Sequence, residues 1–141
     1  MKNYVIFVKN HRKLNFKIED KGDITIVRCV SEKLDSLIAP ELKTLFLHHS
    51  NNGCINFIID LSQAKYCDSS GLSALLVGNR IVKEKEGSLK IFGLNPMVEK
   101  IISISQLDTV FNITDNEETA LKNISWKNYL LLLYLSSLLH L

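Results

Sequence analysis

A buried strand that leads into a helix is the feature of this sequence that most constrains its fold. Residues 55–61 (INFIIDL) form a nearly continuous apolar run with several β-branched side chains, which is typical of a strand covered on both faces. Residues 68–71 (DSSG) then precede a segment with leucines at helical spacing. Strands covered on both faces lie in sheets that carry helices, so this segment predicts an α/β fold.

The rest of the chain continues the alternation of strands and helices. Residues 16–18 and 24–26 alternate apolar and polar side chains around a Lys21-Gly22-Asp23 turn, which predicts a hairpin. Pro40 fits the first turn of a helix that ends at Asn51-Asn52-Gly53. Further elements are expected at residues 88–92 (strand), from Pro96 (helix), at residues 110–113 (strand) and from Asn116 (helix). The order β-β-α-β-α-β-α-β-α predicts a mixed β-sheet of about five strands with about four helices, because crossovers between parallel strands contain helices.

The composition is that of one globular domain. The chain has 141 residues, and its 17 Lys plus Arg against 15 Asp plus Glu give a formal net charge of +2. Apart from a small basic cluster at residues 9–13, nothing favours a nucleic-acid surface, because the two signs are interspersed. Cys29, Cys54 and Cys67 show no C-x-x-C spacing, so we expect reduced thiols. Residues 1–13 do not resemble a secretory signal, and the expected location is cytoplasmic.

The last residues have a different composition. Residues 129–141 (YLLLLYLSSLLHL) are dominated by leucine and carry no formal charge. A helix of this length reaches about 20 Å, less than the roughly 30 Å core of a bilayer, so a membrane span is disfavoured. A core or interface helix, a membrane-surface anchor and a tail without a selected role all remain open. We therefore divide the chain into an N-terminal extension (1–13), one domain (14–122) and a leucine-rich C-terminal tail (123–141), and any membrane contact would involve that tail.

The Asp68-Ser69-Ser70-Gly71 segment is the best candidate for a binding site. The first turn of a helix exposes unpaired N–H groups and about half a positive charge, so these side chains can cap the helix and an anion can bind there. We expect Ser70 to cap the helix, whereas Asp68 either caps it or contacts a partner. Asp60, at the end of the buried strand, is expected to accept hydrogen bonds from the loop backbone, and the alternative is a role at the partner interface.

These motifs resemble the STAS domain, the family of anti-sigma factor antagonists and of cytoplasmic domains on sulfate transporters. The family combines an apolar strand ending in Asp with D-S-S-G-L before a helix. This chain has Ile58-Ile59-Asp60-Leu61 and Asp68-Ser69-Ser70-Gly71-Leu72, and further matches are Leu34-Asp35, Ala39-Pro40-Glu41-Leu42, Gly93-Leu94-Asn95-Pro96 and Leu107-Asp108-Thr109-Val110-Phe111. The resemblance covers about residues 14–122 and implies a STAS-type mixed sheet. Many members have Gly where this chain has Ser31-Glu32-Lys33, so a different turn is expected there.

In the antagonist branch, the resemblance implies a binding protein with no catalytic residues of its own. Ser69 would accept a phosphate from a partner anti-sigma factor that is a serine kinase. The unphosphorylated protein would bind that kinase and free a sigma factor, and a separate phosphatase would restore it. The implied partner-binding residues are Asp35, Asp68, Ser69, Ser70, Gly71 and Leu72. Helical spacing alone cannot assign Leu72 to a partner surface or to the core, although we favour the core. The resemblance implies no cofactor, no metal and no nucleic-acid partner.

Three alternatives to the phosphorylation switch are an enzyme, a metal site and a structural subunit. An enzyme is disfavoured, because D-S-S-G lacks the G-x-S-x-G elbow and the six glycines form no phosphate-binding loop. A metal site is disfavoured as well, because adjacent side chains such as His48 and His49 point about 100° apart on a helix. Some small STAS proteins instead act as structural or regulatory subunits of membrane lipid-transport ABC complexes. Ser69 beside Asp68 favours the phosphorylation switch over this alternative.

Overall fold

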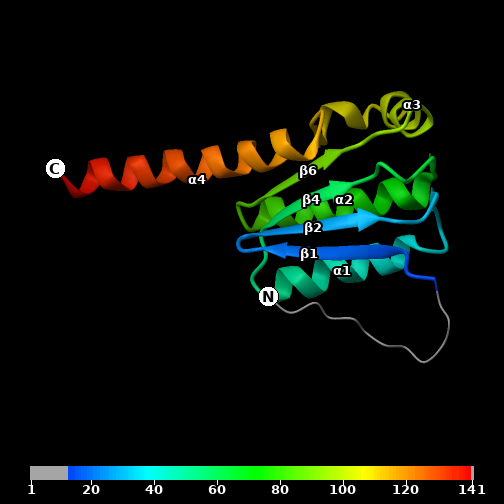
Figure 1. The fold of residues 1–141 in the computed structure, drawn as a ribbon, viewed down its shortest axis with the longest axis horizontal. Helices are drawn as coiled ribbons and strands as arrows, with labels where there is room; N and C mark the ends of the chain where they lie inside the picture. The colour runs from blue at the N-terminus through cyan, green and yellow to red at the C-terminus, as the bar shows by residue number, and fades with distance from the viewer. Residues whose placement is uncertain (1–12, 141) are drawn as a thin grey trace.

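The computed structural model describes residues 13–140, with the side chains of residues 125–132 excepted. Its centre is a mixed five-stranded sheet in the order β1-β2-β4-β6-β7. β1 (Phe16–Lys21) and β2 (Ile24–Cys29) are antiparallel, whereas β4 (Asn56–Asp60), β6 (Ser88–Phe92) and β7 (Asn112–Ile113) continue parallel to β2 (Figure 1). The predicted hairpin is confirmed, and Gly22 adopts the positive φ of 71° that its tight turn requires.

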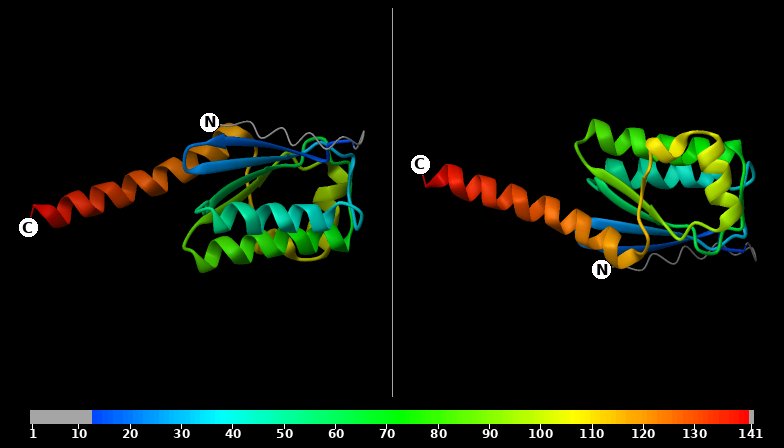
Figure 2. Two further views of the ribbon diagram at one scale, coloured as in Figure 1. Left: turned by 90° about the horizontal axis from the view of Figure 1, so that it is seen from below. Right: turned by 90° about the horizontal axis from the view of Figure 1, so that it is seen from above.

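Helices cover both faces of this sheet. α1 (Ala39–Asn51) and α2 (Ser69–Glu84) pack side by side on one face, and α3 (Pro96–Ile104) adds buried side chains to the same core. α4 (Glu117–Leu139) lies on the opposite face, as the two views of Figure 2 show. Pro40 stands in the first turn of α1, as predicted.

The alternation of side chains along each strand accounts for the nearly continuous apolar run. Phe57 and Ile59 of β4 point into the larger core with α1 and α2, whereas Ile58 belongs to a smaller cluster under α4. That smaller cluster also contains Ile24, Ile26, Phe92, Ala120 and Ile124. The predicted α/β architecture, with about five strands and about four helices, is confirmed.

The structure adds short elements that the sequence pattern does not indicate. β3 (Lys33–Leu34) and β5 (Tyr66–Cys67) form a separate parallel pair, and η1 (Leu107–Thr109) is a single 3-10 turn. β3 and β5 have only two residues each, too few to produce a period-two pattern, so the sequence did not indicate them. β7 is equally short, but it lies within residues 110–113, where we expected a strand. β3 begins within the segment where we expected a different turn, and its pairing with β5 places Leu34 beside Cys67, two residues before α2.

α4 is one helix across the boundary that we place between residues 122 and 123. It begins at Glu117, where the Asn116 side chain caps it, and it continues to Leu139. The division into a domain and a tail therefore falls inside a single element and stays a prediction. No helix within the described part of the chain is both long enough and apolar enough to traverse a bilayer.

Candidate functional site

Asp68 organises the start of α2 at the carboxyl edge of the sheet. It is the N-cap residue, and its Oδ1 accepts a hydrogen bond from the Gly71 N–H at 3.0 Å. Its Oδ2 accepts a hydrogen bond from the Ser36 N–H at 3.3 Å. Asp68 therefore caps α2 and also holds the loop that precedes α1. Our expectation that Ser70 caps the helix is wrong, because the backbone changes from extended to helical at Asp68, two residues earlier.

Gly71 allows the loop after β3 to approach the first turn of α2 very closely. A Cβ atom at this position would lie 2.3 Å from the Leu34 carbonyl oxygen and 2.7 Å from the Cys67 Sγ. The same carbonyl oxygen accepts a hydrogen bond from the Asp68 N–H at 3.2 Å. The glycine of the D-S-S-G motif thus brings the two loops of the candidate site together.

Ser69 is the exposed residue of this motif. It occupies the first position of α2, directly after the cap, where the N–H groups of the first turn give a positive local potential. Ser70 follows and is half-buried. The hydroxyl of Ser69 is therefore accessible to a macromolecule that approaches the carboxyl edge.

The loop between β3 and α1 lies against this motif. Asp35 Oδ1 accepts a hydrogen bond from the Leu37 N–H at 3.1 Å, and the Asp35 carbonyl accepts one from the Ala39 N–H at 2.8 Å. This turn leaves the Leu37 side chain 87% exposed. We did not single out Leu37 from the sequence, although an apolar residue in the polar segment between two elements is a signal that could have found it. Asp35 thus shapes the loop that the Asp68 carboxylate also holds.

Two of the implied partner-binding residues lie inside the protein. Leu72 is only 5% exposed and belongs to the main core, so its side chain is not part of the surface around Ser69. This corrects its inclusion among the contact residues and agrees with the alternative that we favoured, a position in the core. Gly71 is buried too, and it contributes to the site through the shape of the backbone.

The Asp60 carboxylate is hydrogen-bonded to neighbouring groups on the face of the sheet that α4 covers. Its Oδ1 accepts a hydrogen bond from the Ser62 N–H at 2.9 Å, as expected, and its Oδ2 accepts one from Arg28 Nη1 at 2.9 Å. Arg28 also forms ion pairs with Glu19 (3.0 Å) and Glu117 (2.6 Å). The hydrogen bond from Arg28 lowers the pKa of Glu19, and its three carboxylate partners raise the pKa of Arg28. Arg28 was not predicted, but a charged residue in the run ITIVRC was a signal for it.

The cysteines near the site are buried thiols. Burial raises the pKa of Cys67 to about 12 and that of Cys29 to about 11. Cys54 is half-buried, and all three are free. With so little thiolate at neutral pH, Cys67 is suited to packing beneath Gly71 rather than to nucleophilic chemistry.

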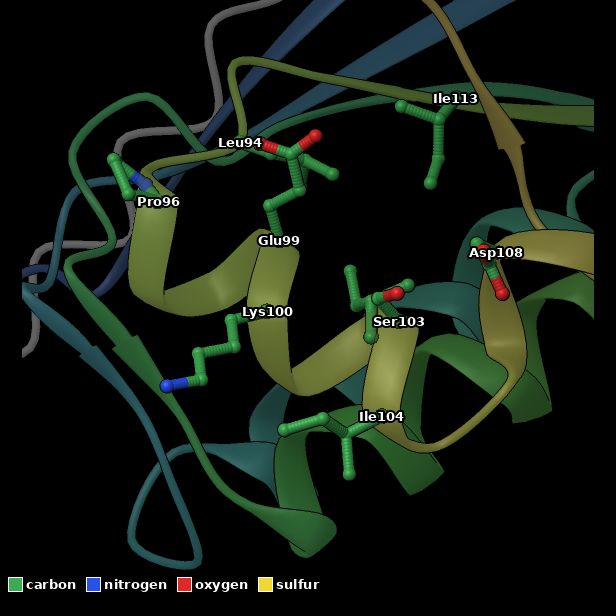
Figure 3. Close-up of a pocket in the computed structure, with 9 residues that line it drawn as sticks. Leu94, Pro96, Glu99, Lys100, Ser103, Ile104, Asp108 and Ile113 are labelled. Atoms are coloured by element: carbon green, nitrogen blue, oxygen red, sulfur yellow. The ribbon is translucent and has the colours of Figure 1, made fainter.

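Two hollows on the surface of the described residues are lined by residues outside the D-S-S-G motif. The larger one, about 440 Å³, is lined by α3, η1 and β7. In Figure 3, Glu99 and Ser103 lie on the side of α3 that faces Asp108 of η1. A second hollow of about 270 Å³ lies near the start of β6. None of the residues that line these two hollows belongs to the D-S-S-G motif, so a small molecule in either hollow would not contact Ser69.

The comparison with known families agrees with the motifs and with the fold. The sequence pattern of the STAS domain matches residues 15–120, about three quarters of the chain. The chain belongs to the STAS domain family. Asp68, Ser69 and the loop held by Asp35 therefore lie within the matched part of this STAS protein.

Relatives of this STAS protein include proteins named as anti-sigma factor antagonists. The anti-sigma F factor antagonist of Paenibacillus polymyxa is 30% identical over 71 residues, which are 50% of this chain and 61% of that protein. The anti-sigma-B factor antagonist of Listeria monocytogenes is 23% identical over 104 residues, which are 74% of this chain and 91% of that protein. The predicted resemblance to this family is thereby confirmed.

Solved structures confirm the STAS fold. The anti-sigma factor antagonist SpoIIAA in its unphosphorylated form matches with a TM-score of 0.63 and 18% identity, over 78% of this chain and 97% of that one. Bacillus SpoIIAA in the phosphorylated form matches with a TM-score of 0.62 and 19% identity, over 77% and 98%. At these identities the likeness establishes the fold.

Proposed function

We propose that this chain is an anti-sigma factor antagonist that binds an anti-sigma factor of the serine kinase type and is released when that kinase phosphorylates Ser69. Binding would free a sigma factor for transcription, and a phosphatase would restore the binding form. On this proposal the protein acts in the cytoplasm as a regulatory binding partner, without catalysis. The relatives named as anti-sigma factor antagonists support this function.

The proposal rests chiefly on the exposure of Ser69, which lies beside the helix cap Asp68 and the loop that Asp68 holds. On one side Asp68 caps α2 with both carboxylate oxygens hydrogen-bonded to backbone N–H groups. The loop that Asp68 holds presents Leu37, which is almost fully exposed. A kinase can therefore reach Ser69 without unfolding the domain, and an apolar side chain lies on the loop beside it.

The same geometry supports a switch that acts at the binding surface. A phosphoserine adds about −1.5 to −2 charges, and a position at a helix N-terminus accommodates this charge within the fold. The Asp68 carboxylate next to it would add to the negative charge that a partner has to desolvate. Phosphorylation would thus weaken binding while leaving the domain folded. The similar match to both forms of SpoIIAA supports this interpretation.

Variants of Ser69 test the function. Tagged full-length protein with Ser69→Ala or Ser69→Asp is expressed in its own cells, and the co-purifying proteins are identified by mass spectrometry. We expect Ser69→Ala to retain an anti-sigma factor and Ser69→Asp to retain about tenfold less, as for a charge that costs about 1.4 kcal/mol at an interface. Ser103→Asp, with the same charge on the exposed face of α3, is the control and should bind as the unmodified protein does.

Two outcomes would contradict the proposal. Equal retention of the anti-sigma factor by Ser69→Asp and Ser69→Ala would show that Ser69 does not control binding. Retention of a transport ATPase by all variants, with no anti-sigma factor, would instead support the structural role in a lipid-transport complex. Circular dichroism of each variant establishes that a loss of binding does not come from unfolding.

A further inference from the structure

The C-terminal part of α4 extends beyond the surface that the STAS domain covers. α4 begins at the carboxyl edge, where Glu117 pairs with Arg28, and Ile124 packs near the start of β6. The helix then continues past the amino edge of the sheet, so that its last turns project away from the domain (Figures 1 and 2). Residues 133–140 are all exposed.

The exposed end of α4 is apolar around most of its circumference. At about 100° per residue, its five exposed apolar side chains spread over roughly 240°. They are Leu133, Tyr134, Leu135, Leu138 and Leu139, and the last of these is 85% exposed. A partner helix covers a stripe only about 100° wide, so a second copy of this chain would leave several of these leucines in water. Lipid surrounds an inserted helix on every side, so a lipid membrane can cover all five of these apolar side chains.

The charges along α4 favour an anionic surface. Glu117 and Glu118 are the last acidic residues of the chain, and only Lys122 and Lys127 carry a formal charge after them. Glu118 and Lys122 form an exposed ion pair at 3.1 Å, which is weak in water and leaves Lys122 available to another anion. The two lysines thus precede an uncharged segment, an order that places positive charge at the headgroups when the apolar segment enters lipid.

We propose that the apolar end of α4 inserts into one leaflet of an anionic lipid membrane and holds the domain at the membrane surface. Residues 128–139 reach about 18 Å, roughly the depth of one leaflet and its interface. This agrees with the absence of a spanning helix from the described residues. Because Ser69 lies at the carboxyl edge and α4 projects past the amino edge, the inserted domain would present Ser69 away from the lipid. The proposal does not depend on the function proposed for Ser69.

Vesicle flotation of the full-length protein tests this inference. The vesicles contain phosphatidylcholine with or without anionic phosphatidylglycerol. We expect the protein to float with the anionic vesicles. A Leu135→Ser/Leu139→Ser variant should bind these vesicles at least tenfold more weakly, because both substitutions remove apolar surface that lipid would bury. Ile104→Ser removes an apolar side chain from α3 whose exposure (71%) lies between those of Leu135 (47%) and Leu139 (85%). This variant is the matched control and should float normally.

Sedimentation of the same proteins without lipid separates the lipid surface from a second copy of the chain. Failure of the unmodified protein to float would overturn the proposal. A stable dimer that the Leu135→Ser/Leu139→Ser variant cannot form, combined with no flotation, would identify this helix end as a self-association surface instead. Equal flotation of both variants would show that another part of the chain binds the vesicles and would likewise contradict the role of α4.

Discussion

Asp68 holds together the two loops of the candidate site, and its contributions can be separated by substitution. Asp68→Ala removes the acceptor for both the Gly71 and Ser36 N–H groups. We expect a loss of about 1–2 kcal/mol in the free energy of unfolding, the usual size of a lost N-cap. Asp68→Asn retains a capping oxygen and should lose much less. Urea denaturation measures both, and equal stability of Asp68→Ala and the unmodified protein would contradict the capping role.

Gly71 is required by a close backbone contact rather than by a turn. A methyl group there would meet the Leu34 carbonyl oxygen at 2.3 Å. We expect Gly71→Ala to lower the free energy of unfolding by about 2 kcal/mol, since overpacking outweighs the better helix propensity of alanine. Ser73→Ala, two residues further along α2, is the control for a mutation in the same helix. An unchanged thermal midpoint for Gly71→Ala would show that the two loops can separate without cost.

The difference between Ser70 and Asp68 illustrates what a single sequence can predict about the site. The sequence indicates that the D-S-S-G segment begins a helix, but it offers three consecutive residues that can act as caps. Which of them caps depends on where the backbone leaves β5, and β5 exists only because it pairs with β3. Leu37 was missed for the same reason, because its exposure depends on the turn that Asp35 stabilises.

The Arg28 ion pairs attach α4 to the sheet. Glu117 in the first turn of α4 contacts Arg28 of β2, which also contacts Asp60 of β4. Glu117→Gln weakens this attachment, so we expect faster amide hydrogen exchange in the first turns of α4 with little change in β4. The free energy of unfolding of this variant should fall by about 1 kcal/mol, which is typical of the loss of one partly exposed hydrogen bond between charged groups. Unchanged exchange in α4 would show that Ala120 and Ile124 alone hold the helix.

The long elements could be predicted from the sequence, whereas the contacts of α4 could not. Periodicity indicates a helix from Asn116 and a leucine-rich tail, but it does not show that they form one helix. Periodicity along one strand also does not predict the contact between Arg28 and Asp60, because these residues become neighbours only in the parallel register of β2 and β4. Elements defined by their own pattern were therefore predicted, and those defined by a partner strand or sheet were missed.

The whole molecule should lose stability in acid through the ion pair between Glu19 and Arg28. The folded pKa of Glu19 is lowered by Arg28, so its stabilisation is present above the unfolded pKa and is lost as the pH falls through the folded pKa. The ordinary glutamate pKa is about 4.3, so we expect the free energy of unfolding to decrease from about pH 5 downward. Glu19→Gln should show a smaller decrease. Denaturation curves at several pH values measure the free energy of unfolding of both proteins. The same pH dependence in Glu19→Gln and in the unmodified protein would contradict this role of Glu19.

Phosphorylation of Ser69 can be tested by mapping phosphate on the protein isolated from its own cells. Trypsin should release residues 66–80, which contain Ser69, Ser70 and Ser73, so fragmentation spectra have to distinguish the three serines. We expect phosphate on Ser69 in part of the population and none on this peptide in Ser69→Ala. Its absence from Ser69 under varied growth conditions, or its presence on this peptide in Ser69→Ala, would contradict the phosphorylation switch.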